Sequence, residues 1–263
     1  MGPVKTFGIY SFPRSGSNWV RNVLYSLLAK PYLQNYVYDK DVQKIIEQDI
    51  PGHPNFDPES GQEFATTQGK LKFFKSHSAA VVESYGGRRL DTRFYCYIMR
   101  HPLDVFLSYL NFLHHYRHEL QWAYSIPLVS VDEHIETGSI EYFFGMFLAV
   151  GNISPGIDNA GSWWLSVEYW LRLKRDYDPF IFLLKYEDCV LDTERALQPL
   201  ANFIGDDCNL IEAIKWNNIM FPKDGGFFWR MERGYYKEVL PPRLIEQFEA
   251  VHGSKLKELG YNI

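Results

Sequence analysis

One short loop constrains the fold of this chain more than any other feature. Residues 5–10 (KTFGIY) predict a buried strand, and residues 19–28 (WVRNVLYSLL) predict a helix with apolar residues along one face. The loop that joins them, SFPRSGSNW, holds small polar residues around a single glycine, Gly16. A strand, a loop and a helix in immediate succession begin an α/β pattern.

The same loop is a candidate anion site. Backbone N–H groups at the N-terminus of a helix, beside Ser hydroxyls and the guanidinium of Arg14, suit a phosphate or a sulfate. The pattern also fits a plainer structure, in which Ser and Asn cap the helix and the Arg lies on the surface.

Strands and helices alternate along the rest of the chain. Further strands are predicted at residues 71–75, 93–99 and 179–185. Helices are predicted at residues 102–118, 162–176, 193–204 and 241–259. We therefore expect one α/β domain over residues 1–263, with a mainly parallel sheet of four or five strands, helices on both faces and a P-loop-like first junction.

Two long segments, residues 31–70 and 119–160, do not fit the alternation, because both are rich in turn-forming residues. Long irregular segments in a compact domain are commonly lids or binding loops, and disorder is the alternative. We expect these two segments to be lids that bind and enclose an acceptor.

The overall composition excludes several classes of protein. Lys and Arg total 27 against 32 Asp and Glu, and the net charge of −5 argues against general nucleic-acid binding. The absence of an apolar run of about 18 residues and of a signal-peptide pattern predicts a soluble, cytoplasmic protein without a membrane partner. The cysteines have no disulfide or metal pattern, so we interpret them as reduced packing residues: Cys96, Cys189 and Cys208.

Two clusters of aromatic or imidazole side chains are not interpreted as metal or cofactor sites. The first has helical spacing typical of a core and consists of Trp163, Trp164, Tyr169 and Trp170. The second could offer two metal ligands but has no acidic third ligand nearby, so it is expected to line an acceptor pocket or a solvated face: His114, His115 and His118.

The loop differs from that of nucleotide triphosphatases. It lacks the G-x-x-x-x-G-K-[ST] pattern, and the strand at residues 93–99 leads to Arg100, where a kinase or an ATPase needs an acidic Mg²⁺ ligand. We therefore predict a site that handles an anionic group without a metal, with Arg14 and Arg100 supplying the positive charge. An ion pair with Asp104 is the alternative role for Arg100.

Several motifs of the chain resemble those of the cytosolic-type sulfotransferases that use 3'-phosphoadenosine 5'-phosphosulfate (PAPS). Residues 12–19 are similar to the family's 5'-phosphosulfate loop, Y-P-K-S-G-T-T-W. Lys75-Ser76-His77 resembles its K-T-H strand end, and Arg100 followed by Ser108 resembles its 3'-phosphate segment. Further similar segments follow in the family's order, namely Gly161-Ser162-Trp163, Tyr186-Glu187-Asp188 and residues 232–261.

This resemblance implies a sulfotransferase fold and an enzyme that moves the sulfonate of PAPS to a hydroxyl or amine of a small molecule, leaving 3'-phosphoadenosine 5'-phosphate (PAP). It implies in-line transfer without a metal, by a monomer or a homodimer. His77 would be the general base and Lys75 a sulfonate contact, although Lys75 could instead be a solubilising residue of an edge strand. In the family, a Lys at this position stabilises the leaving phosphate, and here Arg14 replaces it. Arg keeps the positive charge but cannot donate a proton as Lys can.

The resemblance also implies contacts to the donor nucleotide. The 5'-phosphate would lie on Arg14, Ser15, Gly16, Ser17 and Asn18. The 3'-phosphate would lie on Arg100 and Ser108, and Ser108 is also counted with the catalytic set. Trp19 and Tyr186 would contact adenine, with Asn218 near it. The family's R-K-G is not intact here. For a further 3'-phosphate contact Arg230 is the first candidate and Arg233 the second, with Gly234 beside them.

Two alternatives remain open at this stage. A P-loop nucleotide kinase or phosphotransferase would share the loop but require Mg²⁺. A nucleotide-binding protein without catalysis is indicated only by Arg14 in place of Lys. The Tyr and His content favours a polar or phenolic acceptor, while the choice between O- and N-sulfonation is not encoded in any motif.

Overall fold

A computed structural model describes residues 4–29, 40–52, 61–85, 87–154, 160–178, 180–205, 209–220, 230 and 232–261. The predicted packing residue Cys208 lies outside these ranges. Cys96 and Cys189, which lie within them, are buried free thiols as expected.

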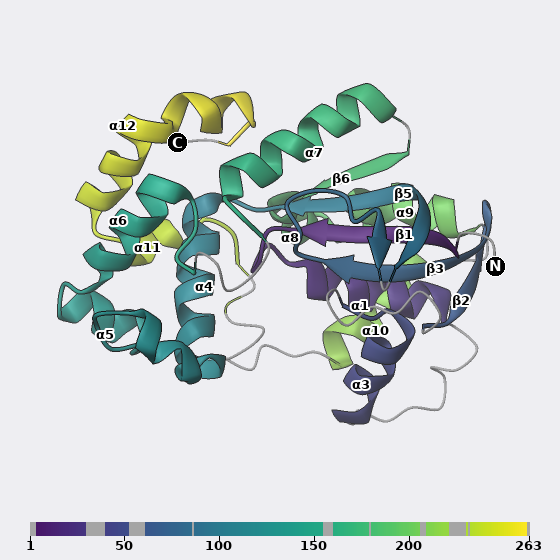
Figure 1. The fold of residues 1–263 in the computed structure, drawn as a ribbon, viewed down its shortest axis with the longest axis horizontal. Coiled ribbons are helices and arrows are strands. Elements are labelled where there is room, and N and C mark those ends of the chain that lie inside the picture. Colours follow the sequence, from purple (N-terminus) through teal and green to yellow (C-terminus); the bar gives the residue numbers. More distant parts are fainter. Residues whose placement is uncertain are drawn as a thin grey trace.

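A mixed sheet forms the centre of the molecule (Figure 1). Its parallel strands run in the order β3 (Gly69–Ser76), β1 (Val4–Ser11), β5 (Arg88–Met99) and β6 (Ile181–Lys185). Two short strands pair in the antiparallel sense, β2 (Glu63–Thr66) with β3 and β4 (Ser84–Tyr85) with β5. The prediction of a mainly parallel sheet is confirmed, and only β2 and β4 were not predicted, because such short strands carry no clear period.

The central strands are buried on both faces, as continuous apolar runs predict. On β1, Phe7 and Ile9 pack into one hydrophobic core and Tyr10 into the other. On β5, Ile98 joins the first core and Tyr97 the second. Each of these five side chains is at most 1% exposed, so the alternation of side chains along a strand divides the interior into two cores.

Helices cover both faces of the sheet (Figure 1). The first core is completed by α1 (Ser17–Leu28), α3 (Lys40–Asp49), α8 (Tyr186–Leu191), α9 (Thr193–Ile204) and α10 (Leu210–Met220). The second is completed by α4 (Pro102–Tyr116), η1 (His118–Ala123), α5 (Val131–Glu136), α6 (Ile140–Val150), α7 (Trp163–Tyr177), α11 (Tyr236–Val239) and α12 (Pro242–Glu258). None of the helices within the described ranges is long and apolar enough to cross a membrane.

The segments predicted to be irregular contain more regular structure than expected. The described part of residues 31–70 includes α3 and β2, and that of residues 119–160 includes most of η1, with α5 and α6. The prediction was wrong for α6 because IEYFFGMFLAV is apolar almost all round, which hides the amphipathic period. Its Phe143, Phe144 and Phe147 are buried in the second core. Residues 31–39, 53–60 and 155–159 lie outside the described ranges.

The Trp-rich helix α7 packs in the core, as its spacing predicts. Trp163 and Trp170 are fully buried, and the ring of Trp170 stacks on Tyr97 with centroids 5.2 Å apart and planes 12° apart. Tyr10 of β1 also contacts Trp170, with a centroid separation of 4.6 Å. Trp170 therefore ties α7 to the two central strands.

Replacing Trp170 by Ala should lower the free energy of unfolding by about 3–5 kcal/mol, because it leaves a cavity against two strands. Urea denaturation followed by circular dichroism measures this change. Leu165→Ala on the same helix is the control, since Leu165 is 64% exposed, and it should cost less than about 0.5 kcal/mol. Equal effects of the two substitutions would contradict the central position of Trp170.

Candidate functional site

The loop between β1 and α1 has a backbone that only certain residues adopt. Gly16 has φ 101° and Arg14 has φ 67°, both in the left-handed region, which is uncommon for a residue with a side chain. A Cβ atom added to Gly16 would lie 2.5 Å from Cδ2 of Tyr186. The loop therefore needs glycine at this position for its conformation and for its contact with the first residue of α8.

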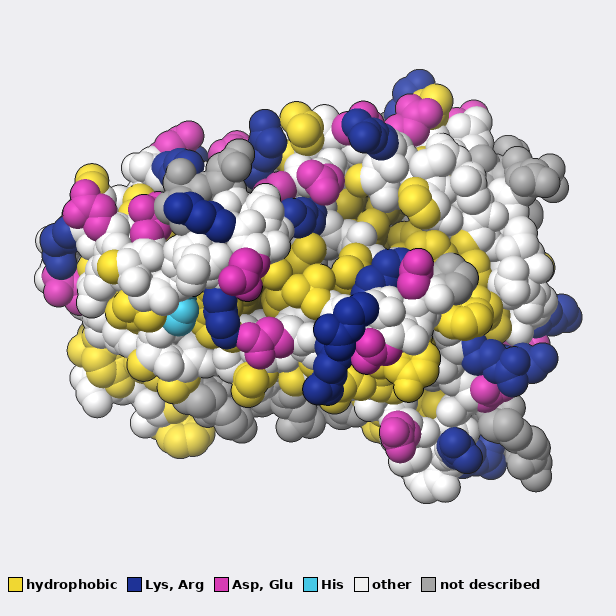
Figure 2. Space-filling view, turned by 90° about the horizontal axis from the view of Figure 1, so that it is seen from above, with side chains coloured by type: hydrophobic (Ala, Val, Ile, Leu, Met, Phe, Trp, Pro, Cys, Tyr) yellow, Lys and Arg dark blue, Asp and Glu magenta, His cyan; other side chains and the backbone are white. Residues whose placement is uncertain are grey.

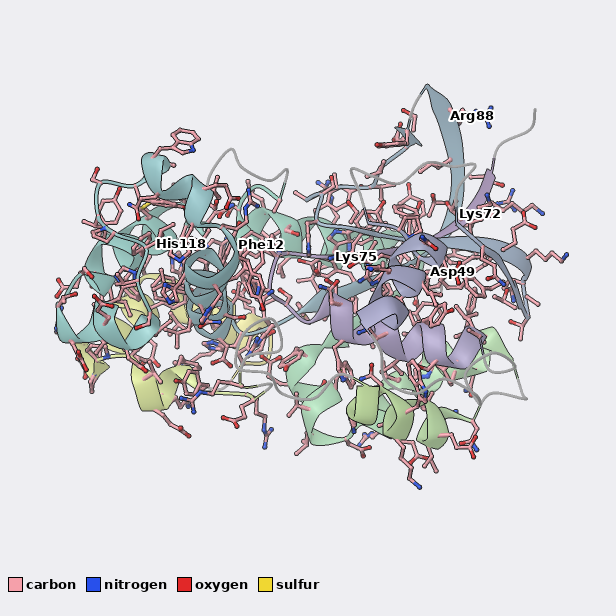
Figure 3. The ribbon with its side chains drawn as sticks, turned by 90° about the horizontal axis from the view of Figure 1, so that it is seen from below. Phe12, Asp49, Lys72, Lys75, Arg88 and His118 are labelled. Carbon is pink, nitrogen blue, oxygen red and sulfur yellow. The ribbon has the colours of Figure 1, made fainter. Side chains whose placement is uncertain are left out.

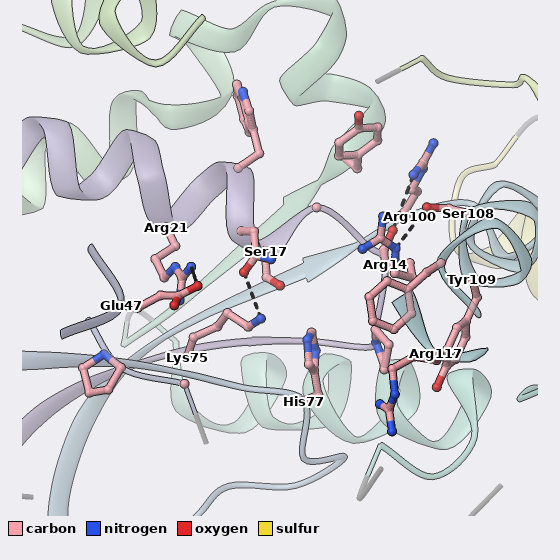
Figure 4. A pocket seen from close by; sticks show the side chains of 18 of the residues that line it. Arg14, Ser17, Arg21, Glu47, Lys75, His77, Arg100, Ser108, Tyr109 and Arg117 are labelled. Atoms are coloured by element: carbon pink, nitrogen blue, oxygen red, sulfur yellow. Dashed lines mark hydrogen bonds and ion pairs between the residues drawn. The ribbon is translucent and has the colours of Figure 1, made fainter. Parts of the chain in front are cut away.

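A cavity of about 1020 Å³ opens beside this loop, at the carboxyl ends of the parallel strands (Figure 4). Most of the predicted site residues line it, although they come from five separate elements. These residues are Arg14, Gly16, Ser17, Asn18, Trp19, Lys75, His77, Arg100, Ser108 and Tyr186. The fold thus brings the loop, the end of β3, the end of β5, α4 and α8 around one space.

His77 follows the last residue of β3 and is held by β1. Its Nδ1 lies 2.9 Å from the carbonyl oxygen of Ser11 and 3.3 Å from the Ser11 hydroxyl. Because a carbonyl oxygen can only accept, Nδ1 carries the hydrogen, and the lone pair of the neutral ring is on Nε2. Burial, and then the charge of Lys75, lower the pKa of His77 well below 6.5, so the ring is neutral near pH 7.

Lys75 lies on a strand that has neighbours on both sides. Its strand, β3, runs between β2 and β1, so the alternative that Lys75 solubilises an edge strand is wrong. The Nζ atom donates a hydrogen bond of 2.9 Å to Oδ1 of Asn18 in the loop. Burial lowers the pKa of Lys75 to about 7, and the charges of Arg21 and Arg14 contribute. This amine therefore loses its proton far more easily than an ordinary Lys.

Arg14 and Ser108 contact each other across the cavity. Nε of Arg14 donates a hydrogen bond of 3.3 Å to Oγ of Ser108, and its guanidinium carbon lies 4.9 Å from the ring centre of Phe112. Burial, and then the charge of Arg100, lower the pKa of Arg14 to about 10. Arg14 keeps its positive charge near neutral pH in spite of this shift.

Arg100 is buried and directed at the loop. Its Nη1 donates 3.4 Å to the carbonyl oxygen of Arg14 and its Nη2 donates 3.0 Å to that of Glu232. Its guanidinium carbon lies 4.4 Å from the ring centre of Tyr186, and its buried Nε has no hydrogen-bond partner. A cation held by backbone carbonyls, with one donor unused, is suited to an anionic ligand.

Asp104, the alternative ion-pair partner of Arg100, instead accepts hydrogen bonds from the backbone. Its two carboxylate oxygens accept hydrogen bonds from the backbone N–H of Gly234, at 2.7 Å, and of Tyr236, at 3.0 Å. These bonds tie the segment around Gly234 to α4, next to the carbonyl of Glu232 that Arg100 contacts. Asp104 therefore positions the C-terminal segment beside the loop.

Five of the predicted residues are not among the described residues that line the cavity, namely Ser15, Asn218, Arg230, Arg233 and Gly234. The Ser15 side chain is buried, and its hydroxyl has no hydrogen-bond partner among the described residues. Asn218, Arg230 and Arg233 are exposed. Residues 221–229, which connect α10 to this segment, lie outside the described ranges.

The imidazole cluster on and after α4 lies on a solvated face. His115 and His118 are exposed, and Nδ1 of His114 lies 3.2 Å from the carbonyl oxygen of Leu128. Figure 3 places His118 well away from Lys75. In the described part of the chain, no group of three His, Cys, Asp or Glu side chains is placed to hold a metal ion.

Sequence reasoning missed four charged residues in the cavity wall, namely Arg21, Glu47, Asp49 and Arg117. Arg21 lies three residues after Asn18 and four after Ser17, which puts it on the same face of α1. A cation on the buried face of an otherwise apolar helix was the signal that could have found it. Glu47 could not be found, because only the packing of α3 brings it here.

The comparisons with known proteins agree with this arrangement. A family model described as "Sulfotransferase domain" matches residues 5–260. A curated relative, the 3-alpha-hydroxysteroid sulfotransferase of Cavia porcellus, is 24% identical over 223 residues, which is 81% of this chain. The match spans 64% of that relative, so less than two thirds of its length is represented here.

Solved structures with the same fold include a mouse sulfotransferase in complex with PAP and a retinol dehydratase in complex with androsterone and PAP. The first has 16% identity and a TM-score of 0.56, covering 98% of this chain and 86% of that one. The second has 15% identity and a TM-score of 0.55, covering 100% of this chain and 83% of that one. At such identities, these likenesses establish the fold.

Replacing Asp104 by Asn should free the segment around Gly234. Asn can accept only through Oδ1 and would point its NH₂ group at one of the two backbone donors, so the free energy of unfolding should fall by about 1–3 kcal/mol. Chemical denaturation and hydrogen exchange at the amides of Gly234 and Tyr236 measure the effect. Asp178→Asn is the control, because Asp178 is 59% exposed. Unchanged exchange in Asp104→Asn would contradict the assignment.

Proposed function

Because the chain belongs to the sulfotransferase domain family, we propose that it transfers the sulfonate group of PAPS to a hydroxyl or amine of a small-molecule acceptor and releases PAP. The observation that carries this proposal is the single cavity shared by the loop, Lys75, His77, Arg100 and Ser108. These side chains provide a neutral base, cations and anion-binding amides in one place.

The residues present fit a nucleotide with two phosphate positions. Three buried donors at or beside the loop have no hydrogen-bond partner among the described residues: the hydroxyl of Ser15, Nε of Arg100 and Nε1 of Trp19. We propose that the amides and hydroxyls of residues 15–18, with Arg14, hold the 5'-phosphate. Arg100 and Ser108 would hold the 3'-phosphate, while Trp19 and Tyr186 would bind adenine.

The C-terminal segment would complete the 3'-phosphate site. Arg233 adjoins Gly234, whose N–H is held by Asp104 beside Arg100. Arg230 instead lies over the ring of Tyr235, with its guanidinium carbon 4.3 Å from the ring centre. We therefore favour Arg233 over Arg230 as the second arginine at the 3'-phosphate. Asn218 stays a weaker candidate for adenine, because its side chain is exposed on α10.

The donor would supply an activated sulfonate, and the chain would supply the proton transfer and the charge. Nε2 of His77 would accept the proton as the acceptor oxygen or nitrogen bonds to sulfur and the bond from sulfur to the phosphate oxygen breaks. Arg14 would stabilise the negative charge that remains on the phosphate, by charge and hydrogen bonds alone. Lys75, whose Nζ donates a hydrogen bond to Oδ1 of Asn18, would contact the sulfonate oxygens.

His77→Ala should abolish transfer while PAP still binds, because the base contacts the acceptor and the nucleotide is held by other residues. Loss of a general base lowers turnover by roughly 10²- to 10⁴-fold. Sulfonate transfer from PAPS measures turnover, and calorimetry with PAP in the absence of Mg²⁺ measures binding. His118→Ala, at an exposed position that does not line the cavity, is the matched control.

Two results would overturn this function. If turnover survives His77→Ala, His77 is not the general base, and the proposed catalytic set lacks its central member. Failure of the wild-type protein to bind PAP, with binding of ATP only in the presence of Mg²⁺, would favour a phosphotransferase instead.

Binding of PAP should be accompanied by proton uptake at pH 8. Lys75 has a pKa of about 7 in the free protein and is mostly neutral at pH 8, and a bound phosphate raises this pKa. Affinity for PAP should therefore fall as pH rises above 7. Calorimetry in two buffers of different ionisation enthalpy measures the proton uptake.

Lys75→Met should abolish the Lys75 contribution to this proton uptake, whereas Lys70→Met, at an exposed position on the same strand, should leave it intact. Uptake that persists in Lys75→Met would assign the proton to another group.

A further inference from the structure

Arg21 is a buried cation that the transfer chemistry does not use. It is 3% exposed, and its Nε has no hydrogen-bond partner in the described part of the chain. Its other contacts are weak: Nη1 lies 3.5 Å from the carbonyl oxygen of Ile50, and Nη2 lies 3.8 Å from Oε1 of Glu47. A buried charge costs stability unless it is paired and fully hydrogen-bonded, so Arg21 is poorly compensated within the protein.

The position of Arg21 separates it from three residues of the proposed nucleotide site, Arg14, Arg100 and Ser108. In Figure 4, Arg21 and Glu47 lie on one side of Lys75, whereas Arg14, Arg100 and Ser108 lie on the other. Lys75 is between the two groups, and His77 lies near it. A ligand group at Arg21 would therefore be beside Lys75, on the side away from Arg14, Arg100 and Ser108.

The wall around Arg21 is polar, and among the described residues neither of its two carboxylates, Glu47 and Asp49, lies within hydrogen-bond distance of Arg21. Gln62 and Asp49 line it together with Arg21, Lys75 and Glu47. Asp49 accepts a hydrogen bond of 3.1 Å from the hydroxyl of Tyr25, and the Glu47 side chain is 57% exposed. Burial lowers the pKa of Arg21, and the charge of Arg21 helps to lower that of Lys75. An anion placed here would relieve this repulsion.

On the basis of the proposed function, we propose that the part of the cavity bounded by Arg21, Lys75, Glu47 and Gln62 binds an anionic group of the acceptor, such as a carboxylate, a phosphate or a sulfate. The acceptor is thus a hydroxyl or amine compound that carries a negative charge beside its reacting group. A neutral apolar acceptor would leave the buried Arg21 with only its weak contacts to Glu47 and Ile50, whereas a carboxylate would receive charge-assisted hydrogen bonds from it.

Three phenols of similar size test this proposal, because they differ mainly in charge: 4-hydroxyphenylacetate, 4-hydroxyphenylethanol and tyramine. With PAPS as donor, the anion should have a KM at least about tenfold below that of the neutral phenol, the effect expected of one charge-assisted hydrogen bond. The order of affinities should place tyramine last. Calorimetry with the PAP-loaded protein measures the same order without turnover.

The variants assign the preference to Arg21. Arg21→Gln should remove the preference for the anion, and Arg21→Lys should retain part of it. Arg175→Gln removes the same charge at an exposed position on α7 and should leave the preference intact. Glu47→Gln removes the carboxylate that competes with the ligand, so it should strengthen the preference, and its exposure makes it safe for folding.

The outcomes separate the two proposals. A wild-type protein that neither binds PAP nor transfers sulfonate refutes the proposed function. If the protein binds PAP but does not prefer the anionic phenol, only the anionic subsite is overturned. The same holds if it binds PAP but none of the three phenols. An Arg21→Gln variant that loses affinity for PAP and keeps the preference also overturns the subsite, since Arg21 would then belong to the nucleotide. Should Arg21→Gln fail to fold, an unchanged preference in Glu47→Gln would equally overturn the subsite.

Discussion

The close contact between Gly16 and the ring of Tyr186 is the constraint on which the site depends. With no side chain at Gly16, the left-handed turn of the loop brings its backbone against the first residue of α8. Arg100 then lies over the same Tyr186 ring and reaches the carbonyl of Arg14. The absence of a side chain at Gly16 thus allows the residues that follow β1, β5 and β6 to contact one another. The N-terminus of α1 lies at the cavity beside them.

The cost of this arrangement is electrostatic. Burial lowers the pKa values of Arg14, Arg21 and Lys75, which share the cavity. Repulsion from Arg21 and Arg14 adds to the shift of Lys75, whose pKa falls to about 7, and repulsion from Arg100 adds to that of Arg14, whose pKa falls to about 10. Because the usual pKa of Lys75 is 10.5, an unfolded chain binds this proton more tightly, and the free protein is destabilised at neutral pH. An anionic ligand reverses that cost, which couples stability to binding.

On the face shown in Figure 2, basic and acidic side chains are interspersed, in keeping with the small negative net charge of the chain. In the cavity, by contrast, the cationic side chains outnumber the carboxylates. Grouped charge in a partly buried space interacts more strongly than the same charge on a surface, because water screens it less. Recognition of anions is accordingly a property of the cavity.

Local patterns in the sequence determined the parallel strands, the loop, the start of α4 at Pro102 and the whole of α9 (Thr193–Ile204), because apolar periods, proline and turn residues act over a few neighbours. The motif residues Lys75 and His77 could be assigned to one strand end for the same reason. Only the tertiary structure decided that Arg21 and Glu47 face that strand end, that Asp104 holds Gly234, and that α6 is a buried helix. These depend on which distant segments pack together, and the pKa of Lys75 depends on how near that packing brings the other cations.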